Sequence, residues 1–210
     1  MAHTDGGELR VVVAGATGKT GSAVTRALLG TQDLRVVAAV AKDHVGEDLG
    51  SVLGVGPLGV TVAGRLAEAL EHVPADVLVD FTAPDVVVHH IETALARRMA
   101  CVIGTTGIPA GELERLGRLA AENELALLVI ANFSLGAMLL KRLAREAARY
   151  FPAIEIIEKH HVTKVDAPSG TALRLAEAIS AVTGGERPPI HSVRLPGFVA
   201  HHEILLGGAG

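Results

Sequence analysis

Hydrophobic and polar positions alternate in blocks along the first 131 residues. Short runs rich in β-branched and other apolar residues lie at 10–15, 35–40, 76–81, 100–104 and 125–131. The segments between them carry more charge on one side than on the other, and this pattern predicts helices over 18–29, 84–98 and 109–122. Strands that alternate with helices are typical of a parallel, doubly wound sheet. We therefore predict an α/β domain over residues 1–131.

One segment of this domain is ambiguous. In "PDVVVHH" at 84–90, three consecutive valines favour a strand, because branched side chains are stiff in a helix. Pro84 is well suited to the first position of a helix, and the following "IETALARR" has a helical pattern. We predict a helix here.

The pattern changes after residue 131. A helix is predicted from about 136 to 150, an extended segment over "AIEIIEKHH" and a further helix over 170–182. Two strands, "HSVRLPG" and "VAHHEILLGG", then follow without a helix between them. We therefore predict a second, smaller α+β domain over residues 132–210.

Composition and charge restrict the class of partner. Basic and acidic residues nearly cancel, for a net charge of −4, and no block of Lys or Arg forms a stripe that could follow a phosphate backbone. Nucleic acid is therefore a poor candidate. With 49% hydrophobic and only 2% aromatic residues, the chain fits helices packed on a parallel sheet.

Targeting signals and cysteine content point to the cytoplasm. The N-terminal "MAHTDGGELR" lacks the basic and apolar regions of a secretory signal. The longest unbroken apolar run, Leu125 to Ala131, is far shorter than the roughly 20 residues that cross a bilayer, so no membrane association is expected. The single Cys101 cannot form an internal disulfide, and "MACVIG" is typical of a buried strand, as expected in a reducing compartment.

A glycine-rich turn follows the first predicted strand. "VVVAGATGKTG" places Gly15, Gly18 and Gly21 between a strand and a helix. In that context the glycines permit a tight turn, close approach of a pyrophosphate and close packing of the helix, whose N-terminus attracts the phosphates. The spacing is GxxGxxG rather than GxGxxG, and a glycine turn that binds nothing is the alternative. The flanking strand and helix favour a Rossmann-like dinucleotide site.

The end of the second predicted strand bears on the choice of cofactor. An acidic residue there usually binds the ribose hydroxyls of NAD, but the sequence reads Ala41-Lys42. Lys42 and Lys19 are both able to face the 2′-phosphate of NADP. We therefore expect NADPH to be preferred, with NADH as the alternative cofactor.

Titratable residues are concentrated in "EIIEKHHVTKVDAPSGTA" at 155–172. If the segment is extended, His160 and His161 point to opposite faces and serve different purposes, one facing the reacting centre. Histidine titrates near neutrality and suits proton donation, while Lys164 is able to hold a carboxylate or help keep a proton available. The cluster therefore predicts proton chemistry on an anionic substrate.

The helix that follows this cluster supplies a second feature. Apolar residues at 172, 175, 176 and 179 have helical spacing, and Ser169, Gly170 and Thr171 form the first turn. The free N–H groups of that turn are suited to bind a carboxylate. Either feature alone has a structural explanation, as strand histidines or as a helix cap. Together with a dinucleotide turn, they favour a catalytic site for a substrate such as a dicarboxylate.

Metal binding is a further alternative, because the ten histidines include the pairs 89–90, 160–161 and 201–202. Adjacent histidines diverge in both helices and strands, and no HxxxH or cysteine spacing supports a tetrahedral site. We predict no metal. The pairs His89-His90 and His201-His202 are interpreted as surface or interface residues.

The motifs taken together resemble those of the 4-hydroxy-tetrahydrodipicolinate reductase family, also called dihydrodipicolinate reductase, of the diaminopimelate route to lysine. The resemblance covers nearly the whole chain, in family order, through "VAGATGKTG", "VDFTAP", "GTTG", "ANFSLG" and the highly specific "EKHHVTKVDAPSGTA". It implies NAD(P)H-dependent reduction of a cyclic imine derived from 4-hydroxy-tetrahydrodipicolinate. It also implies a homotetramer assembled through the second domain, which binds the substrate.

The resemblance also implies roles for individual residues. His160 is expected to donate the proton with help from Lys164, and His161, Gly170 and Thr171 to bind the substrate carboxylates, with Thr106 nearby. The residues expected to contact the cofactor are Gly15, Ala16, Thr17, Gly18, Lys19, Thr20, Lys42, Gly104, Thr105, Thr106, Ile130, Ala131, Asn132 and Phe133.

Two departures from the family pattern stand out. Ala41 replaces the ribose-binding acid, and the chain ends at "EILLGGAG", whereas family members continue further, so we expect exposed sheet edges. Two rival functions fit the sequence less well. A non-catalytic NADP-binding sensor gives no reason for the histidine and lysine cluster, and a semialdehyde dehydrogenase requires a catalytic cysteine in a loop, whereas Cys101 lies in a predicted strand.

Overall fold

The computed structural model describes residues 7–130 and 132–208, and the chain divides into two compact units, Met1–Ala131 and Asn132–Gly210. The division falls where the hydrophobic pattern changes. The roles expected for the two parts, dinucleotide binding and substrate binding, stay predictions.

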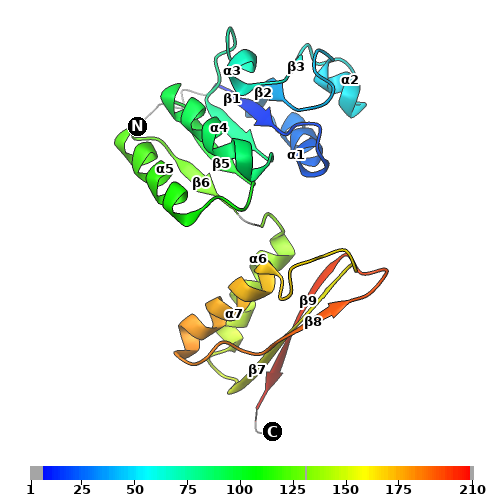
Figure 1. The fold of residues 1–210 in the computed structure, drawn as a ribbon, viewed down its shortest axis with the longest axis vertical. Helices are drawn as coiled ribbons and strands as arrows, with labels where there is room; N and C mark the ends of the chain where they lie inside the picture. Colours follow the sequence, from blue (N-terminus) through cyan, green and yellow to red (C-terminus); the bar gives the residue numbers. More distant parts are fainter. Residues whose placement is uncertain (1–6, 131, 209–210) are drawn as a thin grey trace. The chain divides into compact units, whose positions relative to one another are not determined.

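The first unit contains a six-stranded parallel sheet. Its strands, in the order in which they lie side by side, are β3 (Val62–Ala63), β2 (Leu34–Val40), β1 (Leu9–Ala14), β4 (Val77–Asp80), β5 (Ala100–Ile103) and β6 (Leu127–Val129) (Figure 1). Every neighbouring pair is parallel. The order reverses direction at β1, which confirms the predicted doubly wound, Rossmann-like sheet.

Five helices connect these strands: α1 (Lys19–Leu29), α2 (Leu49–Leu53), α3 (Leu66–Ala69), α4 (Pro84–Ala96) and α5 (Ala110–Glu122). The helix predicted over the three valines is confirmed as α4, which begins at Pro84 and buries Val87 completely. The sequence pattern did not predict α2, β3 or α3. Each has only two to five residues, too few to establish a period.

Both faces of the sheet are covered, because alternate residues of each strand point to opposite sides. Val12 and Ala14 of β1 pack in a core with α4 and α5, while Val11 and Val13 pack in a second core with α1 and α2. A strand buried on both faces must be apolar at consecutive positions. This requirement explains the unbroken hydrophobic runs in the sequence.

The second unit has two helices on a three-stranded sheet, as the predicted α+β pattern requires. Its elements are α6 (Leu135–Ala147), β7 (Ala153–His160), α7 (Gly170–Thr183), β8 (Ile190–Arg194) and β9 (Ala200–Gly207). The central strand β7 is parallel to β8 and antiparallel to β9. The apolar face predicted for α7 is buried against Ile156 of β7 and Ala144 of α6.

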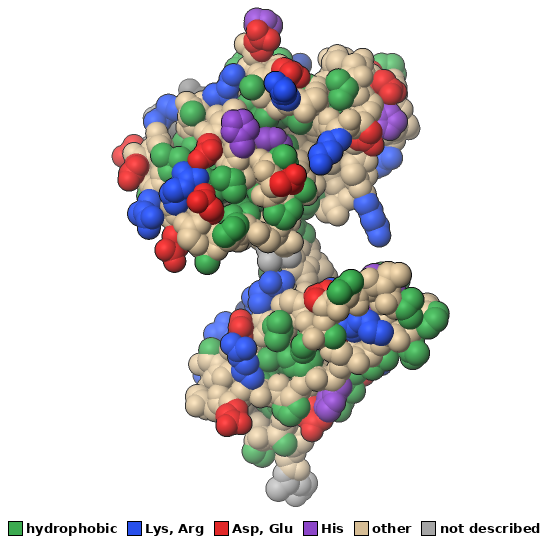
Figure 2. Space-filling view, viewed as in Figure 1, with side chains coloured by type: hydrophobic (Ala, Val, Ile, Leu, Met, Phe, Trp, Pro, Cys, Tyr) green, Lys and Arg blue, Asp and Glu red, His purple; other side chains and the backbone are tan. Residues whose placement is uncertain are grey.

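The surface carries charges of both signs. On the face shown in Figure 2, basic and acidic side chains are interspersed over each unit. Within residues 7–130 and 132–208, no helix is both long and apolar enough to cross a bilayer.

Candidate active site

A cavity of about 300 Å³ opens at the carboxyl ends of β1, β2 and β4 in the first unit. It is lined by Gly15, Thr17, Gly18, Val40, Ala41, Lys42, Asp43, Gly64, Phe81, Thr82, Ala83, Val86 and His90. In doubly wound sheets, ligands bind beyond the carboxyl ends of the strands, where the strand order reverses. The glycine turn therefore lies where a dinucleotide is expected.

Each of the three glycines of the turn has a different structural role. Gly15 has a φ of +78°, which side chains rarely permit. A Cβ on Gly21 would lie only 1.9 Å from the carbonyl oxygen of Gly15, so only glycine lets α1 approach the turn. Gly18 caps α1, and its N–H donates to the Gly15 carbonyl at 3.1 Å. The turn is thus held close to the N-terminus of a helix, where anions are favoured.

The residues predicted to contact the cofactor in this turn lie in three environments. Gly15, Thr17, Gly18 and Lys42 line the cavity. Ala16 is fully buried, whereas Lys19 and Thr20 are exposed on the first turn of α1. Their contacts with a cofactor stay predictions.

An acidic residue that the sequence reasoning missed lies in this cavity. Asp43 follows Lys42, and its Oδ1 accepts a hydrogen bond from the hydroxyl of Thr17 at 2.5 Å. This hydrogen bond holds the pKa of Asp43 below its usual value. Ala41, at the position expected for the acid, is buried. The acidic residue thus stands two positions after the one where it was expected. Its place directly after Lys42 was the signal that the sequence offered.

A buried polar cluster stands at the end of β4. Asp80 is fully buried, and its carboxylate accepts from the Thr82 N–H at 2.9 Å, and from the Thr82 hydroxyl, the Thr105 hydroxyl and His90 Nδ1 at 2.7 Å each. Burial alone would raise the pKa of Asp80, but these hydrogen bonds together lower it. Through these hydrogen bonds the ionised Asp80 carboxylate holds Thr82 and His90, which line the cavity, and Thr105 in place.

The interpretation of His89-His90 as surface or interface residues is wrong for His90, which is buried against Asp80 inside the first unit. Only 9% of His90 is exposed, whereas His89 is exposed. His90 lies three residues after Val87 and one before Ile91, so it shares the buried face of α4. Its helical spacing from the apolar residues was the signal that the sequence offered.

The remaining predicted residues of this unit follow β5 and β6. A Cβ on Gly104 would lie 2.1 Å from the ring of Phe81, so this glycine permits the ring to pack against the backbone. Thr105 is buried and Thr106 is exposed. Ile130 donates its N–H to the Ile103 carbonyl at 2.8 Å. Ala131 lies outside the described residues.

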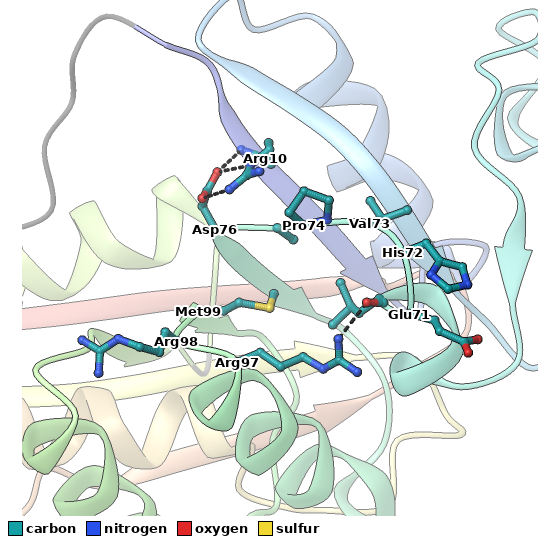
Figure 3. Close-up of a pocket in the computed structure, with 11 residues that line it drawn as sticks. Arg10, Glu71, His72, Val73, Pro74, Asp76, Arg97, Arg98 and Met99 are labelled. Carbon is teal, nitrogen blue, oxygen red and sulfur yellow. Dashed lines mark hydrogen bonds and ion pairs between the residues drawn. The ribbon is translucent and has the colours of Figure 1, made fainter.

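A larger cavity, of about 540 Å³, lies at the opposite, amino-terminal edge of the same sheet. Figure 3 shows that Arg10 from β1 points to Asp76, whose carboxylate it binds through Nε at 2.9 Å and Nη2 at 2.7 Å. Arg97 donates to the Leu70 carbonyl at 2.7 Å. Because these guanidinium groups are already paired within the chain, the cavity is a weaker candidate than the one at the glycine turn.

In the second unit, the residues predicted for proton transfer lie at the end of β7. Ile156, Glu158 and His160 alternate along the strand and are all buried, with 7% of His160 exposed. His161 follows the strand and is exposed, with Nδ1 2.7 Å from the Thr163 hydroxyl. The two histidines therefore have different environments.

The partner of His160 was missed by the sequence reasoning. His160 Nδ1 forms a hydrogen bond with Oε2 of Glu158, which lies two residues earlier on the same face. Arg194 of β8 donates two hydrogen bonds to the same carboxylate, from Nη1 at 3.0 Å and from Nη2 at 2.8 Å. Burial alone would raise the pKa of Glu158, but hydrogen bonds from Arg194, Ser192 and His160 and the Arg194 charge lower it to about 2.

The pair His201-His202 was interpreted as surface or interface residues, and the structure shows that His202 is half-buried beside His160. Its ring meets that of His160 edge to face, with centroids 5.4 Å apart, and Nε2 lies 3.2 Å from the Ser169 hydroxyl. Burial, followed by the charge of His160, lowers the pKa of His202. His202 pairs with Glu158 across β7 and β9, so the strand register brings it to this face.

Lys164 and the start of α7 share a carboxylate from within the chain. Lys164 Nζ donates to Asp166 Oδ1 at 2.6 Å, and Asp166 also accepts from the backbone N–H of Gly170. These interactions, led by the Lys164 hydrogen bond, lower the pKa of Asp166. The two groups that were predicted to bind a substrate carboxylate thus already meet at one carboxylate.

A cavity of about 500 Å³ lies beside His160. Its walls are Asn132, Ser134, Gly136, Ala137, Leu140, His160, Thr171, Ala200 and His202. Asn132 Nδ2 is 3.3 Å from the Thr171 hydroxyl, so the predicted residues at 132 and 171 meet here. Phe133 is about half exposed. His161, Lys164 and Gly170 do not line this cavity.

Metal and thiol chemistry find little support in the described part of the chain. Within residues 7–130 and 132–208, no three His, Cys, Asp or Glu side chains are grouped to hold a metal ion. Cys101 is buried in β5, as predicted, and burial together with the charge of Asp80 raises the pKa of its thiol to about 12. It therefore does not ionise at neutral pH.

Known proteins are similar in sequence to both units of this chain. The family models "Dihydrodipicolinate reductase, N-terminus" and "Dihydrodipicolinate reductase, C-terminus" match residues 9–133 and 136–210. The 4-hydroxy-tetrahydrodipicolinate reductase of Syntrophomonas wolfei is 43% identical, over 96% of this chain and 83% of its own, and that of Moorella thermoacetica is 42% identical with the same coverage.

A solved structure is also similar to the chain. The dipicolinate-bound dihydrodipicolinate reductase of Paenisporosarcina sp. TG-14 has a TM-score of 0.81 and 36% identity, covering 97% of this chain and 84% of that one. The two family models together span nearly the whole sequence, including the glycine turn and the His160 cluster. The chain belongs to the dihydrodipicolinate reductase family.

Proposed function

We propose that the chain is a 4-hydroxy-tetrahydrodipicolinate reductase, an NAD(P)H-dependent oxidoreductase of the diaminopimelate route to lysine. The observation that carries this proposal is the family match through both parts of the chain. The reaction adds a hydride and a proton to the substrate ring and releases water, leaving tetrahydrodipicolinate and the oxidised cofactor. A non-catalytic NADP-binding sensor is not favoured, because curated relatives at about 40% identity carry the name of the enzyme.

The cavity at the glycine turn fits a dinucleotide. Gly15 and Gly18 expose backbone near the N-terminus of α1, and a Cβ at Gly21 would prevent that approach. NAD(P)H, when bound, supplies the hydride. We propose that NADPH is preferred, because Lys42 lines this cavity and is able to face a 2′-phosphate. Asp43 beside it is suited to bind ribose hydroxyls, so we propose NADH as the alternative cofactor.

The second unit is proposed to bind a small dicarboxylate. The Paenisporosarcina relative is described as bound to dipicolinate, which carries this chemistry. In this chain the candidate groups within the second unit are His161 and the Gly170-Thr171 start of α7. The N-terminus of a fourteen-residue helix favours an anion through its dipole.

His160 is proposed to donate the proton. Its Nδ1 is engaged by Glu158, and the ring lines a cavity, so Nε2 is the nitrogen available for transfer. Lys164, with its Nζ held by Asp166, is proposed to assist by keeping a positive charge close to the reacting ring. We also propose a homotetramer assembled through the second domain, located in the cytoplasm.

The experiment that tests this function is a coupled assay in which the product of the preceding synthase is supplied and the loss of NADPH absorbance is followed. His160→Gln should lower kcat by about 10²- to 10⁴-fold, the usual contribution of a general acid, and change KM little. His191→Gln, an exposed histidine of the same unit, is the matched control and should retain full activity. An inactive wild-type protein that still binds NADPH would favour the sensor.

A further inference from the structure

Behind His160, a chain of polar groups crosses all three strands of the second sheet. Glu158 is fully buried, and its neighbours in the strand register are Ser192 on β8 and His202 on β9. His160 is opposite Arg194 in the same register. Because directly paired residues share one face of a sheet, these side chains converge under the proton donor.

The protonation of His160 follows from the state of Glu158. The pKa of Glu158 is lowered to about 2, so its carboxylate is ionised at neutral pH and only accepts hydrogen bonds. Nδ1 of His160 must therefore carry the proton that joins them. Nε2 is the ring nitrogen that this hydrogen bond does not engage.

Arg194 links this pair to the loop that carries Lys164. Besides its two bonds to Glu158, the guanidinium donates through Nη2 to the Asp166 carbonyl at 2.6 Å and through Nε to the Lys164 carbonyl at 3.3 Å. Only 19% of the Arg194 side chain is exposed. One planar group thus fixes the carboxylate under His160 and the backbone on both sides of residue 165.

We propose that Glu158 and Arg194 are positioning residues for proton donation. Glu158 holds the His160 ring so that Nδ1 carries the proton between them and Nε2 faces the reacting centre. Arg194 holds the Glu158 carboxylate and the loop that carries Lys164 in place. This inference rests on the proposed function, because it takes His160 as the donor. It gives a role to Glu158, at the start of the quoted motif, and to Arg194, which lies thirty-six positions further along the chain.

The pH dependence of the reaction should reveal this role. The titratable groups in contact with the His160 ring are Glu158 on its own strand and His202 on β9. Beyond them, Arg194 on β8 is bonded to Glu158, and Lys164 in the following loop is paired with Asp166. Glu158 is the anion bonded to the ring, and its removal leaves the imidazolium without this neighbour.

The experiment compares Glu158→Gln, Arg194→Lys and His160→Gln with Glu155→Gln. Glu155 is an exposed residue of the same strand and is the matched control. Glu158→Gln should lower kcat at least tenfold, with KM and the dissociation constant of NADPH nearly unchanged. The pH above which kcat/KM falls should move lower. Arg194→Lys keeps the positive charge but loses the paired hydrogen bonds that the guanidinium makes to Glu158. We therefore expect a smaller, several-fold fall in kcat.

The outcomes separate this inference from the proposed function. Wild-type kcat in His160→Gln would remove the donor assignment itself. A large loss in His160→Gln, together with an unchanged kcat and pH profile in folded Glu158→Gln, would overturn the positioning role alone. If Glu158→Gln does not fold by circular dichroism, Arg194→Lys decides, and wild-type kcat and pH dependence in that variant would overturn the proposal.

Discussion

At the scale of single residues, charge placement determines the chemistry that the chain is able to perform. Lys42 and Asp43 are adjacent and line the same cavity, yet they favour different ribose groups. A 2′-phosphate is attracted by the lysine and repelled by the carboxylate, whereas ribose hydroxyls donate to the carboxylate. The preference predicted from the sequence rested on Ala41, Lys42 and Lys19, and Asp43 had no part in it.

The cofactor preference can be tested with substitutions at these two positions. Lys42→Ala should raise the dissociation constant of NADPH roughly tenfold, about 1.4 kcal/mol, and leave that of NADH nearly unchanged. Asp43→Asn should weaken NADH more than NADPH. Both constants are measured by titration calorimetry, with Lys141→Ala in α6 as the control. A wild-type protein that binds NADH more tightly than NADPH would contradict the proposed preference.

At the scale of elements, the approach of α1 to the glycine turn builds the nucleotide cavity. A side chain at Gly21 would meet the Gly15 backbone, whereas a side chain at Gly117, in the exposed face of α5, would meet nothing within 4 Å. The spacing of the glycines was visible in the sequence. The short distance that makes the third glycine necessary depends on how closely the helix packs.

Gly21→Ala and Gly117→Ala form a matched pair of substitutions. Gly21→Ala should destabilise the protein by about 1–3 kcal/mol through overpacking and weaken NADPH binding, because α1 must move away from the turn. Gly117→Ala should stabilise it by up to about 1 kcal/mol through helix propensity. Urea unfolding followed by circular dichroism gives both values. Equal effects of the two changes would show that the close approach is not important.

At the scale of the whole molecule, carboxylates paired in the folded state make stability depend on pH. The pKa of Glu158 is lowered from 4.5 to about 2, and those of Asp76 and Asp80 are also lowered. A group with a lowered carboxyl pKa contributes its full stability above the unfolded value and loses it as pH falls toward the folded value. His202, whose pKa is lowered by burial, adds a loss that begins below its ordinary 6.5.

The free energy of unfolding should therefore be greatest near neutral pH and fall as the solution is acidified. For Glu158 alone, the loss between pH 4.5 and pH 2 is on the order of 3 kcal/mol. Urea unfolding at a series of pH values measures the curve. Glu155→Gln should leave it unchanged, since that carboxylate is exposed. A free energy that stays constant from neutral pH to pH 3 would contradict this expectation.

The sequence by itself determined the doubly wound sheet, the division of the chain near residue 131, and the residue types from which the site is built. Periodicity and glycine spacing are local, so they can be read along the chain. Only the tertiary structure brought Arg194 and His202 to Glu158 and His160, because their meeting depends on the register of β8 and β9 against β7. It also placed His90 inside the first unit, where the packing of α4 decides which histidine is buried.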